Sequence, residues 1–403
     1  MEINYGTGKI ISVMNPSLKK LQHISLKKER FIIGLMSGTS MDGLDIALCR
    51  FSGSGVAISF EIKQFESMAY TQDTYQQLVA FETAECLDAL HLCIWHTHLA
   101  NLQAGMINEV LKKWNISSSE IDLIASHGQT LYHAPKHQHQ IKGMPHATLQ
   151  IGDGDHIAAQ TGIITISDFR QRDTARGNEG APLAAYGDFL LFGNPVRHLV
   201  LLNIGGIANF TWLPAGRDTF PPLSFDTGPG NTLIDAATRM YFQGLRFDSK
   251  GGLAARGTIN RPLLDKLKRH PYFKQPAPKT TGFETFNLKW VERCMAENSL
   301  ELHAEDLLAT LTQLTVDTIA DEILQVVPDD EPVEVYVSGG GVYNNMLMKG
   351  LSNAIENIPV RTIQTLDINP DAKEALIMAA LANELICGED SRLHLGKISL
   401  PDV

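Results

Sequence analysis

The stretch Phe31–Leu48, FIIGLMSGTSMDGLDIAL, determines how the rest of the chain is interpreted. Two apolar runs flank a turn of glycines and small polar residues, which is longer than the two-residue loop that a simple hairpin needs. Either the turn is merely long, or its N–H groups and hydroxyls bind a ligand. Because no helical pattern follows directly, the stretch predicts two antiparallel strands joined by a phosphate-type turn, unlike the strand–turn–helix of a dinucleotide-binding domain.

Composition narrows the class of protein. The 403 residues favour two domains, and the 44% of hydrophobic residues suffice for buried sheets. No apolar run approaches the roughly 20 residues of a membrane span. The net charge of −11, with scattered cations, argues against nucleic acid as a partner, because phosphate neutralisation needs clustered cations. Five cysteines without a C-x-x-C pair predict a reduced, cytoplasmic protein with buried thiols.

Strands and helices alternate along the chain. Runs rich in β-branched residues predict strands at Phe31–Met36, Leu44–Phe51, Val56–Phe65, Ile163–Ser167, Leu199–Ile204, Ile207–Leu213 and Pro332–Val337. Helical periodicity appears at Ala84–Trp114, Ala181–Phe192, Asn231–Phe242, Asn287–Asn298, Ala304–Val327 and Ala372–Ile386. This order predicts an α/β protein with mixed sheets.

No Pro- or Ser-rich linker marks a domain boundary, so we expect the boundary in a tight crossover near Asp168–Gly180. The first lobe would span 31–167 and the second 168–371, with the helix at about 372–387 packing back on the first lobe. Residues 1–30 contain several lysines but no apolar run of secretory length, and are expected to form a mobile extension.

Three glycine-rich turns follow strands, at Ser37–Gly43, Asn203–Asn209 and Ser338–Asn344. Glycine lets a backbone adopt positive φ and lets a ligand approach the N–H groups closely. Each turn alone is explained as well by a tight hairpin or a bulge. Three in one chain favour a polyphosphate bound by nests of N–H groups, with the third turn, ahead of a helix, receiving a nucleoside face or a phosphate.

Asp42 places a carboxylate in the first turn, where the Mg²⁺ of a triphosphate would be held by one or two carboxylates, phosphate oxygens and water. Asp45 falls inside the following strand and is the weaker candidate. The sequence contains no G-x-x-x-x-G-K-[ST] and completes no G-x-G-x-x-G, which disfavours a P-loop protein and a dinucleotide-binding protein.

Polar residues at expected strand ends are the candidates for chemistry. Asp168 and Arg170 follow the strand Ile163–Ser167, where an α/β fold places its ligand crevice, although a surface ion pair would look the same. Asp226 precedes a rigid Gly-Pro-Gly turn that would hold a general base, with an Asx-turn as the alternative. His127 and Gln129 offer neutral donors to a polar ligand, or cap a strand end.

Seven motifs, in this order, carry a resemblance to a known family: GLMSGTSMDGLD, SHGQT, QIGDGDHIA, DFRQRD, NIGGIANF, DTGPGN and SGGGVYN. The stretch from Phe31 to Cys387 resembles the anhydro-N-acetylmuramic acid kinases of bacteria. The resemblance implies the sugar kinase/heat-shock protein/actin superfamily, with two lobes of actin/hexokinase-like (ribonuclease H-like) topology and an ATP cleft between them. It also implies a homodimer that binds ATP, Mg²⁺ and a small anhydro amino sugar.

The resemblance also assigns residues. Asp226 matches the catalytic aspartate, Asp42 is the metal candidate, and the substrate-binding candidates are His127, Gln129, Asp168, Arg170 and Glu374. The nucleotide-binding candidates are Gly38, Thr39, Ser40, Met41, Asp42, Gly43, Leu44, Asp45, Gly205, Gly206, Gly339, Gly340, Gly341 and Asn344.

The implied reaction opens the 1,6-anhydro bridge with water and transfers the γ-phosphoryl group to O6, giving N-acetylmuramic acid 6-phosphate and ADP. Two alternatives remain open on this fold: another sugar or acyl-phosphate kinase, and an actin- or chaperone-like ATPase. A glycosidase with paired carboxylates has no use for three glycine turns.

Overall fold

Two β-sheets organise the chain, one of seven strands and one of five, and each lies in its own unit. Unit 1 comprises Met1–Ala181 and Met378–Val403, and unit 2 comprises Pro182–Ile377. The division follows Ala181, so the segment 168–181, expected in the second lobe, belongs to unit 1. The computed structural model describes residues 15–38, 40–84, 86–193, 196–216, 221–328 and 331–402.

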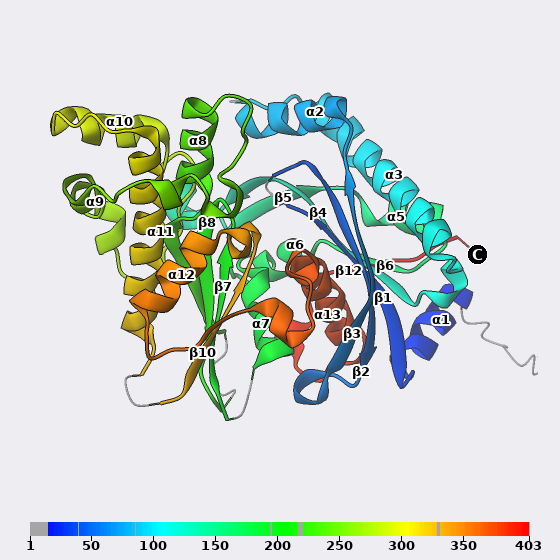
Figure 1. Ribbon diagram of the computed structural model, residues 1–403. Coiled ribbons are helices and arrows are strands. Elements are labelled where there is room, and N and C mark those ends of the chain that lie inside the picture. Colours follow the sequence, from blue (N-terminus) through cyan, green and yellow to red (C-terminus); the bar gives the residue numbers. More distant parts are fainter. Residues whose placement is uncertain are drawn as a thin grey trace, which may run out of the picture. The chain divides into compact units, whose positions relative to one another are not determined.

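Unit 1 contains most of the first half of the chain (Figure 1). Its strands are β1 (Glu29–Ser37), β2 (Gly43–Ser52), β3 (Ser59–Ala69), β4 (Leu123–Ala134), β5 (Ala147–Ile151), β6 (Thr165–Ser167) and β12 (Lys397–Ser399). Its helices are α1 (Pro16–Ser25), α2 (Gln72–Thr83), α3 (Ala89–Trp114), α4 (Lys136–His139), α5 (Gly154–Thr161) and α6 (Phe169–Thr174).

The sheet of unit 1 has the order β12-β6-β4-β1-β2-β3, with β5 paired to β4. β1 runs antiparallel to β2, and β2 to β3, which confirms the strand–turn–strand prediction for Phe31–Leu48. β4 lies parallel to β1 on one side and to β6 on the other. Apolar side chains of β1 and β2 and the buried face of α3 form one core cluster, which holds the ends of β1 and β2 in place.

Residues 15–30 are folded, so the prediction of a mobile extension over 1–30 is wrong for this part, and residues 1–14 lie outside the described residues. Asn15 caps α1, because its side chain accepts hydrogen bonds from the N–H groups of Ser17 and Leu18. Ile24 is buried, and the Ser17 hydroxyl donates to the Pro401 carbonyl at 3.2 Å.

Unit 2 is also built from a β-sheet and helices. Its strands are β7 (His198–Ile204), β8 (Ile207–Leu213), β9 (Leu223–Pro229), β10 (Val333–Ser338) and β11 (Val360–Thr362). Its helices include α7 (Leu183–Phe192), α8 (Thr232–Tyr241), α9 (Arg261–Leu267), α10 (Leu288–Glu297), α11 (Ala304–Val326) and α12 (Asn345–Ala354). Helix α13 (Lys373–Cys387) begins in unit 2 and ends in unit 1.

The order in the second sheet is β11-β10-β7-β8-β9. As in unit 1, three antiparallel strands are followed by two parallel strands on the other side of the first. Numbered within each sheet, with β5 and β12 left aside, both orders are 3-2-1-4-5, which is the ribonuclease H-like topology that the family resemblance implies. The α/β fold class is confirmed.

Strand β7 is buried on both faces, as its apolar run predicts. Val200, Leu202 and Ile204 point into the core that α8, α11 and α12 cover, and Leu199 and Leu201 point to the side of α7 (Figure 1). The carboxyl end of β7 is therefore fixed from both sides. No helix within the described ranges is long and apolar enough to cross a bilayer.

Candidate active site

The first glycine turn joins β1 to β2. It is closed by a hydrogen bond from the Met41 N–H to the Gly38 carbonyl at 3.2 Å, and the Ser40 hydroxyl donates to Asp42 Oδ1 at 2.6 Å. Met41 has φ = 55°, in the left-handed region, and its side chain is buried in the core of unit 1. This uncommon backbone at a non-glycine residue is held by tertiary packing, as at many ligand-binding turns. Thr39 lies outside the described residues.

The two glycines of this turn differ in what surrounds them. A Cβ at Gly43 would lie 2.5 Å from the Met68 carbonyl oxygen, so only glycine fits there. A Cβ at Gly38 would meet nothing nearer than Ser40 Oγ at 3.9 Å. Gly38 is thus not required by its own chain, and its open side leaves room for a ligand to approach the backbone.

A chain of buried hydrogen bonds holds the first turn in place. Ser37 and Gln129 are partners across β1 and β4, and the Ser37 hydroxyl donates to Gln129 Oε1 at 2.6 Å. Gln129 Nε2 donates to the Gly38 carbonyl at 3.2 Å, and Tyr70 and Gln103 extend the chain from Ser37. Gln129, predicted to bind substrate, thus has both amide atoms directed to the turn.

The residues of the first turn fit a nucleotide and its cation only in part. Asp42 is exposed, and its carboxylate would supply one ligand to a Mg²⁺ that takes its others from phosphate and water. Leu44 and Asp45 lie inside β2, and the Leu44 side chain is in the core, so only its backbone remains for a ligand. The Met41 side chain is likewise buried, so at Met41 too only the backbone remains for a ligand.

His127 lies inside β4 rather than at a strand end, because β4 continues to Ala134. Its Nδ1 lies 2.9 Å from the Gly128 carbonyl, and its Nε2 accepts a hydrogen bond from Arg170 Nε at 2.9 Å. Burial and the Arg170 charge lower the pKa of His127 to about 3, so the ring is neutral, with its proton on Nδ1. Arg170 Nη1 also donates to the Gly180 carbonyl at 3.0 Å, which fixes the guanidinium.

Asp168 stands between β6 and α6 with φ = 56°, and its carboxylate pairs with Lys397 at 3.1 Å. A non-glycine residue in this conformation next to Arg170 is a sign of a functional constraint. Glu374 is exposed in the first turn of α13, beside Lys373, whose ammonium forms a buried pair with Asp188 at 2.9 Å. The structure thus brings His127, Asp168 and Arg170 into one neighbourhood of unit 1.

The second glycine turn, between β7 and β8, is tied to the start of α8. The N–H groups of Gly230 and Asn231 donate to the carbonyls of Gly206 and Gly205, both at 2.8 Å. A Cβ at Gly230 would lie 2.4 Å from the Gly205 oxygen, so this contact requires glycine. Asn231 stands at the N-terminus of α8, but its side chain makes no capping hydrogen bond. Its amide donates to the Ile204 and Gly205 carbonyls instead.

The third glycine turn lies beside the second, because β10 pairs in parallel with β7 and Ser338 is opposite Asn203. A Cβ at Gly339 would lie 2.5 Å from Asn203 Oδ1, and one at Gly341 2.4 Å from Ile204 Cγ2. Gly340 has nothing nearer than Asn231 Nδ2 at 3.9 Å, so its open side resembles that of Gly38.

Asn344 ends the third turn and caps the next helix. Its Oδ1 accepts hydrogen bonds from the N–H groups of Met346 and Leu347, at the start of α12. The second and third predicted phosphate turns are therefore neighbours at one end of the five-stranded sheet, because the two strands that lead into them are parallel.

Asp226 lies within β9, opposite Asn209 of β8, and not at a strand end as the sequence suggested. The pairing of β8 and β9 is irregular at Ala208 and Asn209, and three residues further along β9 lies Pro229, opposite Ile207 of the second turn. Asp226 is thus on the strand that leads directly to the contacts between Gly230 and Gly206.

Three hydrogen bonds fix Asp226. Its N–H donates to the Lys279 carbonyl at 2.9 Å, its carbonyl accepts from the Tyr272 hydroxyl at 2.6 Å, and its Oδ2 accepts from the Thr281 N–H at 2.9 Å. Burial raises the pKa of Asp226 to about 6, against the Thr281 hydrogen bond that lowers it, and Glu284 adds a smaller rise. A carboxylate with this pKa is suited to act as a base near neutral pH.

Tyr272 and Thr281 were missed in the sequence, although both contact Asp226. They lie in 271–286, a segment with little regular structure and a cis Ala277–Pro278 bond, which gives no periodic pattern. Ser37 and Tyr70 were missed for a different reason. A hydroxyl at the end of an apolar run is common, and only the register of β1 with β4 places Ser37 against Gln129.

Comparison with known proteins identifies the family. The family model described as "Anhydro-N-acetylmuramic acid kinase" matches residues 30–395. Proteins of that name from Pseudoalteromonas atlantica and Pseudoalteromonas translucida are 42% and 41% identical, each over 96% of this chain and 100% of the relative. A solved structure, component A of (R)-2-hydroxyglutaryl-CoA dehydratase from Acidaminococcus fermentans, is 11% identical, with a TM-score of 0.45 over 89% of this chain and 99% of that one. This chain belongs to the anhydro-N-acetylmuramic acid kinase family.

Proposed function

We propose that this chain uses ATP to phosphorylate anhydro-N-acetylmuramic acid while opening its 1,6-anhydro bridge, a reaction of peptidoglycan recycling. The observation that carries the proposal is Asp226, a partly buried carboxylate with a pKa raised to about 6, on the strand that leads into the second phosphate turn. The identity of the substrate is inferred from membership of the family, which matches nearly the whole chain.

Asp226 is the general base in this proposal. Since Thr281 occupies Oδ2, Oδ1 is the atom that takes a proton from water. The water oxygen then bonds to C1 of the sugar, the C1–O6 bond breaks, and O6 attacks the γ-phosphorus of ATP. The bond from the γ-phosphorus to the bridging oxygen breaks, and ADP leaves with the electron pair. The product is N-acetylmuramic acid 6-phosphate.

The glycine turns bind the nucleotide in this proposal. N–H groups around Gly38 and around Gly205 and Gly206 would donate to phosphate oxygens, and the third turn at Gly340 would receive the adenosine side. Asp42 would hold Mg²⁺, which when bound neutralises charge on the transferred phosphoryl group. The open sides of Gly38 and Gly340 support this assignment.

Arg170 binds the lactyl carboxylate of the sugar in this proposal. Its Nε is used by His127, so a carboxylate would pair with the terminal nitrogens of the guanidinium. Asp168 and Glu374 are assigned to hydroxyl or amide groups of the sugar. His127 supports Arg170 rather than the sugar, and Gln129 supports the first phosphate turn.

The direct test is Asp226→Asn, assayed for turnover and for sugar binding. We expect kcat to fall by several orders of magnitude with sugar affinity largely kept, because removal of a base affects the chemical step first. An Asp226→Asn enzyme with normal kcat would refute the role of Asp226. The reaction in ¹⁸O-labelled water distinguishes this chemistry from that of a conventional sugar kinase, because only bridge opening places solvent oxygen at C1.

We also propose that the enzyme is a cytoplasmic homodimer, as the resemblance implies. All five cysteines are free thiols, two of them buried, which suits a reducing compartment. Light scattering on the purified protein measures the oligomeric state, and the mass of a monomer would contradict the dimer.

A further inference from the structure

A buried ion pair lies behind the candidate base. Lys279 Nζ is 2.5 Å from Glu322 Oε1, and the two side chains are 2% and 8% exposed. Removing two charges from water costs more than most such pairs return, and apolar residues of similar volume are often at least as stable. A pair this deeply buried is weak evidence for stability. The residues around it indicate a role in function instead.

Lys279 is linked to both of the other residues that hold Asp226, to Tyr272 by direct contact and to Thr281 along the chain. Its Nζ donates to the Tyr272 carbonyl at 3.3 Å and lies 4.8 Å from the centre of the Tyr272 ring. The backbone carbonyl of Lys279 accepts from the Asp226 N–H, and two residues on, the Thr281 N–H donates to Asp226 Oδ2. The three hydrogen bonds of Asp226 are therefore made with Lys279 itself, with Tyr272, which Lys279 contacts, and with Thr281, two residues further along the chain.

Helix α11 supports the second phosphate turn as well as this segment. Thr315 and Glu322 lie two helical turns apart on one face of α11. The Thr315 hydroxyl is 2.9 Å from the Gly230 carbonyl, and the Gly230 N–H donates to the Gly206 carbonyl at 2.8 Å. Helix α11 is thus linked to the second phosphate turn through Thr315 and Gly230, and to the segment that holds Asp226 through Glu322.

We propose that the Lys279–Glu322 pair anchors the segment 277–281 to α11. The pair thereby holds the Asp226 carboxylate in a fixed position relative to the second phosphate turn. The inference depends on the proposed role of Asp226. Lys279 and Glu322 act through Thr281 and Tyr272 and touch no substrate, so they are positioning residues.

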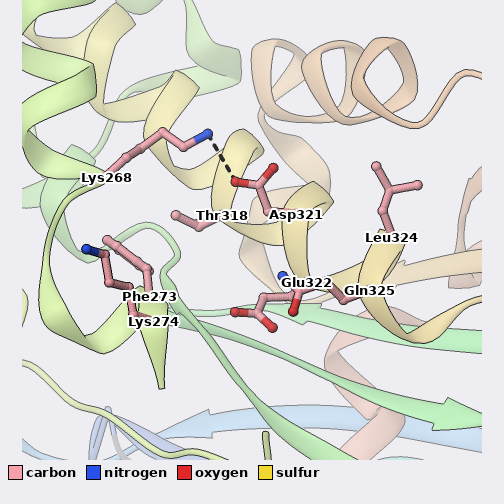
Figure 2. Close-up of a pocket in the computed structure, with 8 residues that line it drawn as sticks. All are labelled: Lys268, Phe273, Lys274, Thr318, Asp321, Glu322, Leu324 and Gln325. Atoms are coloured by element: carbon pink, nitrogen blue, oxygen red, sulfur yellow. Dashed lines mark ion pairs between the residues drawn. The ribbon is translucent and has the colours of Figure 1, made fainter. Parts of the chain in front are cut away.

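A cavity of about 310 Å³ beside the pair supplies a matched control (Figure 2). Figure 2 shows the ion pair of Lys268 and Asp321 on one side of the cavity and the Glu322 carboxylate on the other. Asp321 is on the same helix and lines the same cavity as Glu322, but it pairs with Lys268 at 3.0 Å. Asp321→Asn therefore removes a negative charge from the neighbouring, more exposed position on α11 without loosening the segment at Lys279.

The test is Glu322→Gln, compared with wild type and with Asp321→Asn. We expect kcat to fall about tenfold or more, equivalent to about 1.4 kcal/mol, with KM for ATP and for the sugar changed by less than about twofold. Asp321→Asn should retain the wild-type kcat. Thermal unfolding of each variant verifies that it is folded.

The pH profile separates positioning from simple electrostatics. Titratable groups around Asp226 are Tyr272 from η5 (Pro271–Lys274), Lys279 from the segment 277–281, Glu284 just after that segment, and Glu322 from α11. Loss of the negative charge of Glu322 would by itself lower the pKa of Asp226. A loosened Thr281 hydrogen bond raises the pKa instead. We expect the acid limb of kcat/KM to move to higher pH in Glu322→Gln and to stay in place in Asp321→Asn.

A folded Glu322→Gln enzyme with normal kcat overturns the inference, and so does an acid limb that stays or moves to lower pH. If Glu322→Gln does not fold, the double variant Lys279→Met/Glu322→Leu, which buries no charge, carries the same test, and normal kcat in it overturns the inference. Asp226→Asn, assayed in parallel, separates the two proposals. If Asp226→Asn is inactive and Glu322→Gln is normal, only the positioning role fails, whereas an active Asp226→Asn enzyme refutes the base itself.

Discussion

Asp226 and His127 are both largely buried, and burial acts on their charges in opposite directions. For Asp226 it raises the pKa to about 6, because the charged form is the carboxylate. For His127 it lowers the pKa to about 3, because the charged form is the imidazolium, and the Arg170 charge acts in the same direction. The raised pKa suits Asp226 to the proposed role of a base near neutral pH, and the lowered pKa keeps His127 a neutral acceptor for the Arg170 hydrogen bond.

The pKa of Asp226 predicts the pH dependence of the rate. Asp226 must be deprotonated to accept a proton, so kcat/KM should fall about tenfold per pH unit as the pH drops below about 6. The measurement is kcat/KM for the sugar between pH 5 and 8 with saturating ATP. A rate that stays level down to pH 4.5 would contradict this assignment of the base.

The pKa of His127 predicts a loss of stability in acid. The unfolded chain binds a proton at His127 near pH 6.5, whereas the folded protein does so only near pH 3. Stability is therefore lost as the pH falls from 6.5, by about 2 kcal/mol at pH 5 from this group alone. Urea denaturation at pH 7.5 and pH 5.0 should show a smaller difference for His127→Gln than for wild type, and equal differences would refute the prediction.

Among the elements, apolar runs and glycine turns were predictable and irregular strands were not. The hairpin of β1 and β2 and the helix α11 lie close to their predicted ranges. β9 was predicted to end at Asp226, because Gly228 and Pro229 resemble a loop in composition, whereas the strand continues to Pro229. β4 was predicted too short, since the polar side chains that follow Ala125 interrupt its apolar pattern although the strand stays buried. Departures from strand patterns of this kind are expected where residues serve a functional site.

The turn between β1 and β2 offers a matched pair of substitutions. Gly38→Ala adds a Cβ on an open side, so stability should remain near wild type while KM for ATP rises about tenfold or more through contact with the phosphates. Gly43→Ala places its Cβ against the Met68 carbonyl, so it should lose stability by about 1–3 kcal/mol. Thermal unfolding and ATP kinetics on both variants check this. Normal ATP affinity in Gly38→Ala would contradict a phosphate at that turn.

At the scale of the whole molecule, the same strand order occurs twice, and unit 1 is assembled from two separated stretches of chain. The sequence predicted two α/β lobes but placed their division at residue 168. No change in composition marks Ala181, and α6 and the residues after it are tied to unit 1 by hydrogen bonds between residues far apart in the sequence, such as those that Arg176 donates to the Arg392 and His394 carbonyls. Contacts of this kind leave no pattern in a single sequence.

Removal of residues 397–403 tests the second stretch of unit 1. The truncation takes away β12, which pairs with β6 over Lys397–Ser399, and the Pro401 carbonyl that Ser17 contacts. We expect the free energy of unfolding to fall by about 1–3 kcal/mol, with faster hydrogen exchange at β6. Exchange at β7 and β10 should not change, and equal acceleration there would contradict two separate units.

The split of unit 1 also sets an order during translation. Residues 182–377 leave the ribosome as one uninterrupted stretch, so the five-stranded sheet can form while the polypeptide is still being elongated. The seven-stranded sheet has to wait with β6 as an unpaired edge until Lys397–Ser399 emerge. The sheet of unit 1 therefore stays incomplete after the five-stranded sheet can already form, and we expect chaperones to bind the nascent protein in that interval.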